Sequence, residues 1–261
     1  CCDTVVNCSR FNSSIKLTSN MNVGSIKENS EEKRVSITPD SAKNIISLGL
    51  NVIVEKDYAE HLGIPDDIYK KNGVKILNSS QEVIQESNLL LKVGCPKSEE
   101  IELLKKNMII IGVFNPSKNQ KKLKEIQNKG INIFSLELLP RITRAQSMDV
   151  LSSQSNLAGY RAVVESVYEF QKAIPMMMTA AGTVPAAKVL IIGAGVAGLQ
   201  AVATAKRLGA VVSATDVRSA SKEQVESLGG KFLTVEQVEN LETKGGYAKE
   251  MTDEFKKKQS E

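Results

Sequence analysis

The chain has 261 residues, 41% of them hydrophobic and 25% charged, which is the balance of a soluble globular protein with room for one large or two ordinary domains. Its 34 basic and 30 acidic residues are interspersed, and no basic stretch alternates with aromatic residues, so the composition argues against a nucleic-acid partner. Four cysteines without a CxxC pair, a single histidine, and no apolar run near the roughly 18 residues of a membrane span argue against a zinc site and a transmembrane helix.

Residues 1–20 precede the first predicted domain. They are rich in serine and asparagine and hold one acidic residue, Asp3. We interpret them as a disordered N-terminal extension; the alternative is the tail of a processed or transit segment. Because the sequence does not begin with methionine, we expect it to be a piece of a longer product.

Residues 21–140 alternate between short apolar runs and helical stretches, which predicts a parallel α/β lobe with helices on both faces of the sheet. The apolar runs are nearly continuous, as in strands that are buried on both faces. Thr38 and Pro39 give one helix its cap and first turn, and Gly49 and Gly130 stand where helices end. The predicted strands are residues 23–26, 51–55, 74–77, 89–93, 108–114 and 131–136, and the predicted helices are residues 39–49, 66–73, 79–87, 97–106 and 117–130.

Residues 141–187 form the predicted connection to a second domain. They open with RITRAQSMDVLSSQSNLAGYR, which carries more hydrogen-bonding side chains than a helix start needs, and continue into an apolar helix over residues 161–173. Residues 174–187 hold two prolines and a glycine and show no clear period, so we predict an interdomain linker. The methionines at 176–178 are interpreted as packing residues rather than sulfur ligands.

Residues 188–261 begin a second α/β unit. Its predicted strands are residues 188–193, 211–216 and 231–235, and its predicted helices are residues 196–209 and 221–229. A complete doubly wound domain has about six strands in two halves, and only the first half is expected here. We therefore predict an incomplete NAD-binding Rossmann domain, truncated in its C-terminal half, with an unpaired apolar sheet edge.

The stretch GAGVAG, from Gly193 to Gly198, follows a predicted strand and opens a predicted helix, which is the context of a dinucleotide-binding turn. Gly193 allows the tight turn, Gly195 lets the backbone approach a pyrophosphate, and Gly198 lets the helix pack close to the strand. Ala194 and Val196 complete the predicted cradle, because the free N–H groups of a helix N-terminus bind phosphate.

Asp216 ends the next predicted strand, where an acidic residue accepts hydrogen bonds from the adenosine ribose hydroxyls. Its charge would repel a 2′-phosphate, which favours NAD(H) over NADP(H), although Arg218 weakens that preference. Val217 and Arg218 complete the predicted cofactor site. The alternatives are a glycine turn without a ligand and an Asp216 that only caps the strand end.

Five stretches, which together span about residues 22–255, resemble one protein family. They are EKRVSITPDS, LLLKVGCP, PRITRAQSMDVLSSQSNLAGYRAVVE, TAAGTVPAAKVLIIGAGVAGLQAVATAKRLGA and GGYAKEMTDEF. The chain is similar to domain I, the NAD(H)-binding component, of the proton-translocating NAD(P) transhydrogenases. The third stretch is specific to that family, whereas the first, second and fourth are shared with the related alanine dehydrogenases.

The resemblance implies two Rossmann-like lobes with NAD(H) in the interlobe cleft, and a homodimer of domain I. It also implies that NADP(H) is held on a separate domain, that hydride passes directly between the two nicotinamides, and that a membrane domain couples this transfer to proton movement. The complete protein would then be associated with an energy-coupling membrane, such as the mitochondrial inner membrane. We expect this segment itself to be soluble, and to be inactive and poor at binding NADH on its own.

The resemblance also assigns roles to residues of the opening connection. Arg141, Gln146 and Asp149 match family positions that contact the nicotinamide end and the approaching NADP(H) domain, and Ser152 and Tyr160 match further positions near them. Hydride transfer between two bound nicotinamides needs alignment and exclusion of water rather than a protein acid or base. Hydrogen-bonding side chains are suited to that task.

Two other functions are kept as alternatives: an alanine-type amino-acid dehydrogenase and a non-catalytic NAD-binding redox module. Arg34 and Lys92 align with alanine dehydrogenase residues that hold the oxoacid carboxylate. That reaction needs a general acid and base, but Asn115 stands near the place of the catalytic histidine, and His61 lies in a loop-like context. We therefore interpret Arg34 and Lys92 as structural charge pairs.

Overall fold

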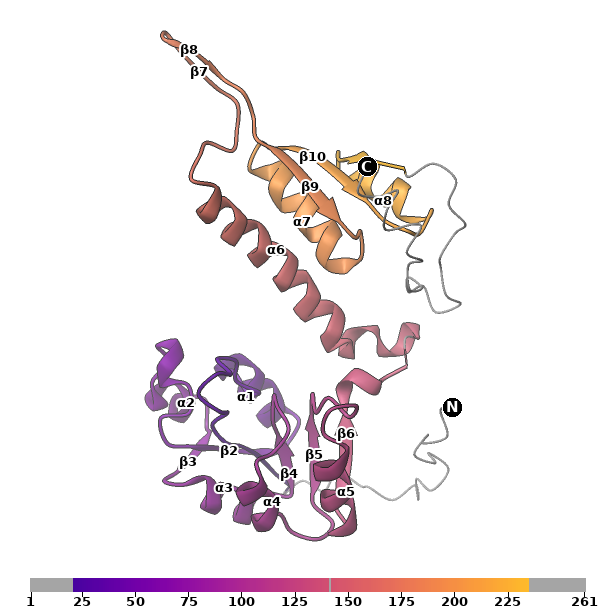
Figure 1. Cartoon of the computed structure of the whole chain (residues 1–261). Helices are drawn as coiled ribbons and strands as arrows, with labels where there is room; N and C mark the ends of the chain where they lie inside the picture. Colours follow the sequence, from indigo (N-terminus) through magenta and orange to yellow (C-terminus); the bar gives the residue numbers. More distant parts are fainter. Residues whose placement is uncertain (1–20, 141, 235–261) are drawn as a thin grey trace. The chain divides into compact units, whose positions relative to one another are not determined.

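The computed structural model describes residues 21–140 and 142–234, which form two compact units (Figure 1). The first unit ends at Met148 and the second begins at Asp149, and each is described by itself. The predicted N-terminal extension (1–20), Arg141 and the polar tail after Thr234, including the stretch GGYAKEMTDEF, lie outside the described residues.

The first unit is built on a 6-stranded sheet with the order β3-β2-β1-β4-β5-β6, in which all neighbouring strands are parallel. This is the strand order of dinucleotide-binding domains, with the switch of direction between β1 and β4. The strands are β1 (Asn22–Ser25), β2 (Asn51–Glu55), β3 (Lys75–Leu77), β4 (Leu89–Leu91), β5 (Ile109–Gly112) and β6 (Asn132–Ser135). Each falls within one of the apolar runs of the sequence or overlaps it, so the predicted parallel α/β fold is confirmed.

Helices connect these strands where the sequence predicts them. They are α1 (Pro39–Ser47), α2 (Asp66–Lys71), α3 (Ser80–Glu86), α4 (Ser98–Leu103) and α5 (Gln120–Asn128), with short 3₁₀ helices η2 (Glu60–Leu62), η3 (Leu136–Leu138) and η4 (Thr143–Met148). Thr38 caps α1 by accepting a hydrogen bond from the Ser41 backbone N–H at 3.2 Å. Gly49 and Gly130 adopt positive φ angles of 82° and 74° just beyond α1 and α5, as expected for glycines that end helices.

Both faces of the first sheet are buried because successive strand residues point to opposite sides. In β2, Val52 and Val54 join a core with Ala42 of α1 and Tyr69 of α2. The residue between them, Ile53, joins a second core with helices α3, α4 and α5. Covered strands of this kind explain why the apolar runs in the sequence are continuous rather than alternating.

Tyr58 holds the segment between β1 and α1 against the first sheet. Its hydroxyl lies 2.7 Å from the Ser25 hydroxyl and accepts hydrogen bonds from the backbone N–H groups of Ser36 (3.0 Å) and Ile37 (3.2 Å). Tyr69 fixes the same place by donating to the Ile37 carbonyl at 2.8 Å. Burial raises the pKa of both tyrosine hydroxyls.

We expect Tyr58→Phe to lower the free energy of unfolding by about 1–3 kcal/mol, because the Ser36 and Ile37 N–H groups lose their acceptor in a buried place. Urea denaturation of the variant and of Tyr168→Phe measures this effect, since Tyr168 is 74% exposed and serves as the matched control. Equal midpoints for the two variants would contradict the prediction.

The second unit begins with the long helix α6 (Val150–Phe170), which packs along α7 (Figure 1). Its sheet has the order β11-β10-β9 and is parallel, which matches the first half of a doubly wound domain. The remaining elements are β7 (Met177–Thr179), β8 (Gly182–Val184), β9 (Lys188–Ile192), α7 (Val196–Arg207), β10 (Val211–Thr215), α8 (Ser221–Ser227) and β11 (Lys231–Phe232).

The predicted linker over residues 174–187 has regular structure instead. Strands β7 and β8 pair in antiparallel fashion and form a hairpin that extends away from the rest of the second unit (Figure 1). Met176, Met177 and Met178 are 59%, 47% and 76% exposed, so they do not pack within the described part of the chain as expected.

Strand β9 forms an edge of the second sheet. Among the described residues it pairs only with β10, and its side chains Leu190 and Ile192 are 57% and 69% exposed. An apolar edge of this kind invites pairing with a further strand. The predicted unpaired apolar edge is therefore present within the described part of the chain.

Candidate dinucleotide-binding site

A tight turn joins β9 to α7 in the second unit. Gly193 has a φ of 95°, a left-handed conformation that favours glycine, and its N–H donates to the Thr215 carbonyl of β10 at 2.8 Å. Gly195 is the N-cap of α7, so the first N–H groups of the helix follow directly after it. The predicted strand–turn–helix context of GAGVAG is therefore confirmed.

The glycines at 195 and 198 differ in what surrounds them. A Cβ atom on Gly198 would lie 1.8 Å from the Gly193 carbonyl oxygen, so only glycine fits between the helix and the turn. A Cβ atom on Gly195 would meet only the Arg218 guanidinium, at 3.9 Å. Gly195 therefore leaves space above the turn, where the dinucleotide interpretation places the pyrophosphate.

Asp216 lies beside this turn, at the end of β10. Its side chain is 6% exposed, and its Oδ2 atom accepts a hydrogen bond from the Ala194 N–H at 2.6 Å. Its Oδ1 atom accepts from the Arg218 backbone N–H at 2.8 Å and from Arg218 Nε at 2.9 Å. The structure thus brings the acidic residue, the glycine turn and Arg218 together, and Val217, which lies between Asp216 and Arg218 in the chain, is half-buried.

Two opposing effects act on the pKa of Asp216. Burial raises this pKa, but the hydrogen bonds from Arg218 and from the Ala194 N–H outweigh burial and hold the pKa below its usual value. The carboxylate is therefore ionised at neutral pH, as an acceptor of two hydroxyl groups must be.

Helix α6 is fixed against the helix that the glycine turn opens. A Cβ atom on Gly159 would lie 2.0 Å from the Ala197 carbonyl oxygen, so the two helix backbones touch there. Nearby, the Asn156 amide donates to Gln200 Oε1 at 3.1 Å. Asp149 precedes Gly159 by ten residues of helix, about 15 Å at 1.5 Å per residue, so it lies well beyond the turn along α6.

Asp149 is the N-cap of α6. Its Oδ1 atom accepts from the Ser152 N–H at 2.9 Å, and its Oδ2 atom accepts from the Ser152 hydroxyl at 2.7 Å. Helix α6 therefore starts eleven residues earlier than the apolar helix predicted from residue 161. Tyr160 is 52% exposed on the same helix.

The remaining predicted nicotinamide-end residues fall elsewhere. Gln146 lies in η4 at the end of the first unit, with an exposed side chain. Arg141 lies outside the described residues. Asp149 and Ser152 are thus the two members of this set that the structure brings into contact.

The cap gives Asp149 a structural role that can be separated from a functional one. We expect Asp149→Ala to destabilise the second unit by about 0.5–2 kcal/mol, because the N-cap is lost. Asp149→Asn keeps a good cap and removes the charge, so its stability should stay near that of the unchanged protein. Thermal unfolding of both variants tests this, and equal losses would show that the charge, not the cap, stabilises α6.

Lys92 lies at the switch point of the first sheet and is 4% exposed. Its Nζ atom is 3.6 Å from Glu28 Oε2 and 3.1 Å from Glu100 Oε2. Glu28 also accepts from the N–H groups of Val93 (2.7 Å) and Gly94 (3.4 Å). The sequence interpretation of Lys92 as a structural charge pair is confirmed, although it missed both partners. The acidic Glu28 just after the first strand was the available signal.

Arg34 pairs with Glu32 at 2.7 Å, so it too forms the expected charge pair. The hydrogen bond from Arg34 outweighs burial and lowers the pKa of Glu32. His61 lies in η2 with its Nε2 atom 2.9 Å from the Lys33 carbonyl, in an exposed place. Asn115 has a φ of 47° and its N–H donates to Glu137.

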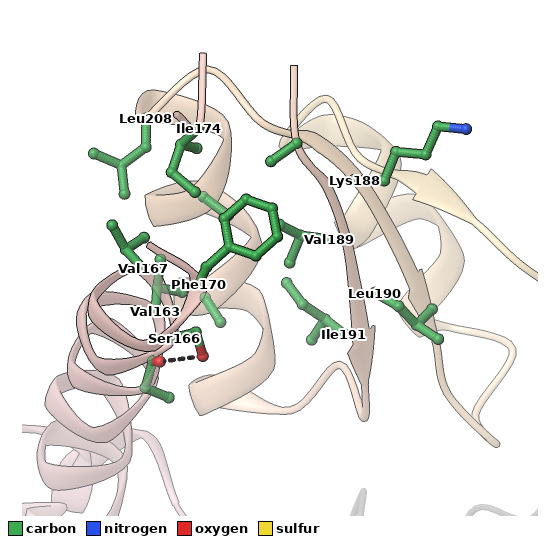
Figure 2. A pocket seen from close by; sticks show the side chains of 14 residues that line it. Val163, Ser166, Val167, Phe170, Ile174, Lys188, Val189, Leu190, Ile191 and Leu208 are labelled. Carbon is green, nitrogen blue, oxygen red and sulfur yellow. Dashed lines mark hydrogen bonds between the residues drawn. The ribbon is translucent and has the colours of Figure 1, made fainter. Parts of the chain in front are cut away.

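A separate apolar pocket of about 430 Å³ lies between α6, β9 and α7 (Figure 2). Phe170, Val167 and Leu208 line it, so it is at the end of α7 opposite the glycine turn. Its polar groups are few: the Ser166 hydroxyl is bonded to the Ala162 carbonyl at 2.7 Å, and Lys188 stands at the rim of β9. This lining is unsuited to a dinucleotide.

Residues 21–140 and 142–234 contain no group of three or more His, Cys, Asp or Glu side chains arranged to hold a metal ion. In the same part of the chain, no helix is both long enough and apolar enough to cross a membrane.

Two parallel α/β units, one with a complete six-strand order and one with a glycine turn beside an ionised aspartate, define a protein of the Rossmann type. Residues 24–158 match the family model described as "Alanine dehydrogenase/PNT, N-terminal domain", and residues 162–258 match "Alanine dehydrogenase/PNT, C-terminal domain". The chain belongs to the alanine dehydrogenase/PNT family.

Its relatives agree with the transhydrogenase resemblance. The first of the separate polypeptides named NAD(P) transhydrogenase subunit alpha in Rhodospirillum rubrum is 51% identical over 237 residues, which cover 88% of this chain and 62% of that protein. A solved structure of transhydrogenase from Sinorhizobium meliloti has 49% identity and a TM-score of 0.78, and the match covers 82% of this chain and 64% of that one.

An L-alanine dehydrogenase structure shares the fold at 23% identity, with a TM-score of 0.70 over 81% of this chain and 60% of that one. The resemblance and the fold class expected from the sequence are thus confirmed, and the family implies binding of a nicotinamide nucleotide. The chain spans 62% of the length of the curated relative from Rhodospirillum rubrum.

Proposed function

We propose that this chain is the NAD(H)-binding part of a proton-translocating NAD(P) transhydrogenase. The observation that carries the proposal is the joined cradle of the second unit, in which the Ala194 N–H of the glycine turn donates to the carboxylate of Asp216 at 2.6 Å. One end of this cradle suits a pyrophosphate and the other suits the adenosine ribose. The transhydrogenase relatives support the choice of reaction.

In this proposal, NADH gives a hydride from its nicotinamide C4 atom to the C4 atom of NADP⁺ on a separate domain, and NAD⁺ and NADPH result. No proton is exchanged with a side chain at the reacting carbons, so the protein must align the two rings and exclude water. Asp216 favours NAD(H), because its negative charge opposes the 2′-phosphate of NADP(H).

Gln146 and Asp149, with Arg141, are proposed to orient the nicotinamide end and to meet the NADP(H)-bearing domain. The exposed side chain of Gln146 and the position of Asp149 at the start of α6 support this role. Ser152, bonded to Asp149, is then a positioning residue. A homodimer, a membrane domain that conducts protons and a location at an energy-coupling membrane are further parts of the proposal.

Gln146→Asn tests the proposed site in the complete protein. We expect NADH to bind within about twofold of the unchanged protein, while hydride transfer to the NADP(H)-loaded domain slows by about tenfold or more, because alignment of the rings is lost. Gln127→Asn, at an exposed position of α5, is the matched control. An unchanged transfer rate with Gln146→Asn would remove this residue from the site.

An alanine-type dehydrogenase is the second enzyme to test. Oxidation of NADH by pyruvate and ammonia would support it, yet Asn115 occupies the expected histidine position, and His61 lies on an exposed 3₁₀ helix. A redox module without catalysis would instead bind NADH and show no transfer to an NADP⁺-bearing domain.

A further inference from the structure

Asp216 is saturated with hydrogen-bond donors in this structure. Four N–H groups of the described residues reach its carboxylate: the backbone N–H groups of Ala194 (2.6 Å) and Arg218 (2.8 Å), and the Nε (2.9 Å) and Nη2 (3.0 Å) atoms of the Arg218 guanidinium. A carboxylate offers about four acceptor sites. A ribose therefore finds no vacant acceptor on Asp216 unless one of these donors leaves.

The four donors are not equally replaceable. The two backbone N–H groups are fixed by the glycine turn and by the end of β10, whereas the guanidinium is on a flexible side chain. Its Nε and Nη2 atoms bind one to each carboxylate oxygen, in the two-pronged geometry that arginine prefers. The 2′ and 3′ hydroxyls of a ribose are likewise two neighbouring donors.

We propose that the Arg218 guanidinium is a built-in substitute for the adenosine ribose, which must displace it from Asp216 to bind. Arg218 is thereby a specificity-determining residue that reduces the advantage given by the two ribose hydroxyls. The inference rests on the proposed binding of a dinucleotide at the glycine turn, and it adds a competitor inside the site.

The displaced guanidinium stays close to the ligand. In the structure its Nη2 atom lies 3.9 Å from the Cβ position of Gly195, on the side of the turn where the pyrophosphate is expected. Arg218 thus opposes the ribose at Asp216 and, once displaced, attracts phosphate. A change in the affinity for NADH alone would mix the two effects, so the test needs a pair of ligands that differ only in the hydroxyls.

ADP and 2′,3′-dideoxy-ADP form this pair, and their dissociation constants are measured by calorimetry with the complete protein. Any attraction of Arg218 to phosphate cancels in the ratio of the two constants. We expect the preference for ADP over the dideoxy ligand to rise by about tenfold in Arg218→Met, because the hydroxyls no longer displace a charge-assisted pair. Arg218→Ala should give the same rise and guards against a local effect of the methionine.

The controls separate this inference from the proposed function. Arg207→Met removes an exposed charge from the last turn of α7 and should leave the ratio unchanged. Asp216→Ala should abolish the preference for ADP. An unchanged ratio in both Arg218 variants, with the preference still lost in Asp216→Ala, would overturn the inference alone. A complete protein that binds neither ligand would overturn the dinucleotide site and the inference together.

Discussion

Lys92→Met is expected to lower the free energy of unfolding of the first unit by about 3–5 kcal/mol, the cost of removing one partner from a buried charge pair. Lys92 is 4% exposed, and its ammonium lies between Glu28 and Glu100, whose side chains are 7% and 13% exposed. Methionine fills a similar volume but leaves two carboxylates with no cation at the switch point between β1 and β4.

The measurement is urea denaturation of the complete protein, with hydrogen exchange of the β1 and β4 amides to assign the loss to the first unit. Lys121→Met, at an exposed position of α5, should change stability by no more than about 0.5 kcal/mol. Adding Glu100→Gln to Lys92→Met should recover part of the loss, because one unpaired charge is removed. If Lys92→Met is as stable as the control, the charge cluster does not hold the switch point together.

The sequence predicted the first lobe well because its strands are buried on both faces. Continuous runs such as LLL in β4 and the III of β5 have no other place than the middle of a covered sheet. The glycine turn was equally readable, because the conformation of Gly193 and the close contact at Gly198 each exclude other residues.

The β7–β8 hairpin was missed because its side chains carry no period that distinguishes two faces. All six residues of the two strands are exposed, so the apolar Met177 and Met178 do not alternate with buried partners. Methionine is also not among the residues enriched in strands. The stretch from Thr179 to Gly182 holds a turn, but one glycine with two alanines is a weak signal of a hairpin.

The start of α6 was placed too late for a related reason. Polar residues between Asp149 and Asn156 looked like a loop, yet Asp149 caps the helix with Ser152, and Asn156 reaches across to α7. Partners that are distant in sequence, such as Glu28 for Lys92, follow from the strand order rather than from any local pattern.

The glycine pair of the turn allows the effects of folding and of ligand binding to be separated. Gly198→Ala should destabilise the second unit by about 3 kcal/mol or more, because its Cβ atom would lie 1.8 Å from the Gly193 carbonyl oxygen and the turn backbone would have to move. Gly195→Ala meets no such obstacle, since Gly195 has a φ of −74° and an extended backbone that alanine adopts.

We expect Gly195→Ala to cost no more than about 1 kcal/mol of stability, the difference between glycine and alanine as an N-cap. Its affinity for ADP should nevertheless fall by about tenfold or more, because the added methyl group occupies the space through which the pyrophosphate approaches the backbone. Urea denaturation and calorimetric titration of the two variants measure both quantities. A stable Gly195→Ala variant that binds ADP normally would show that the phosphate does not rest on this turn, whereas a stable Gly198→Ala variant would mean that the turn and α7 separate without cost.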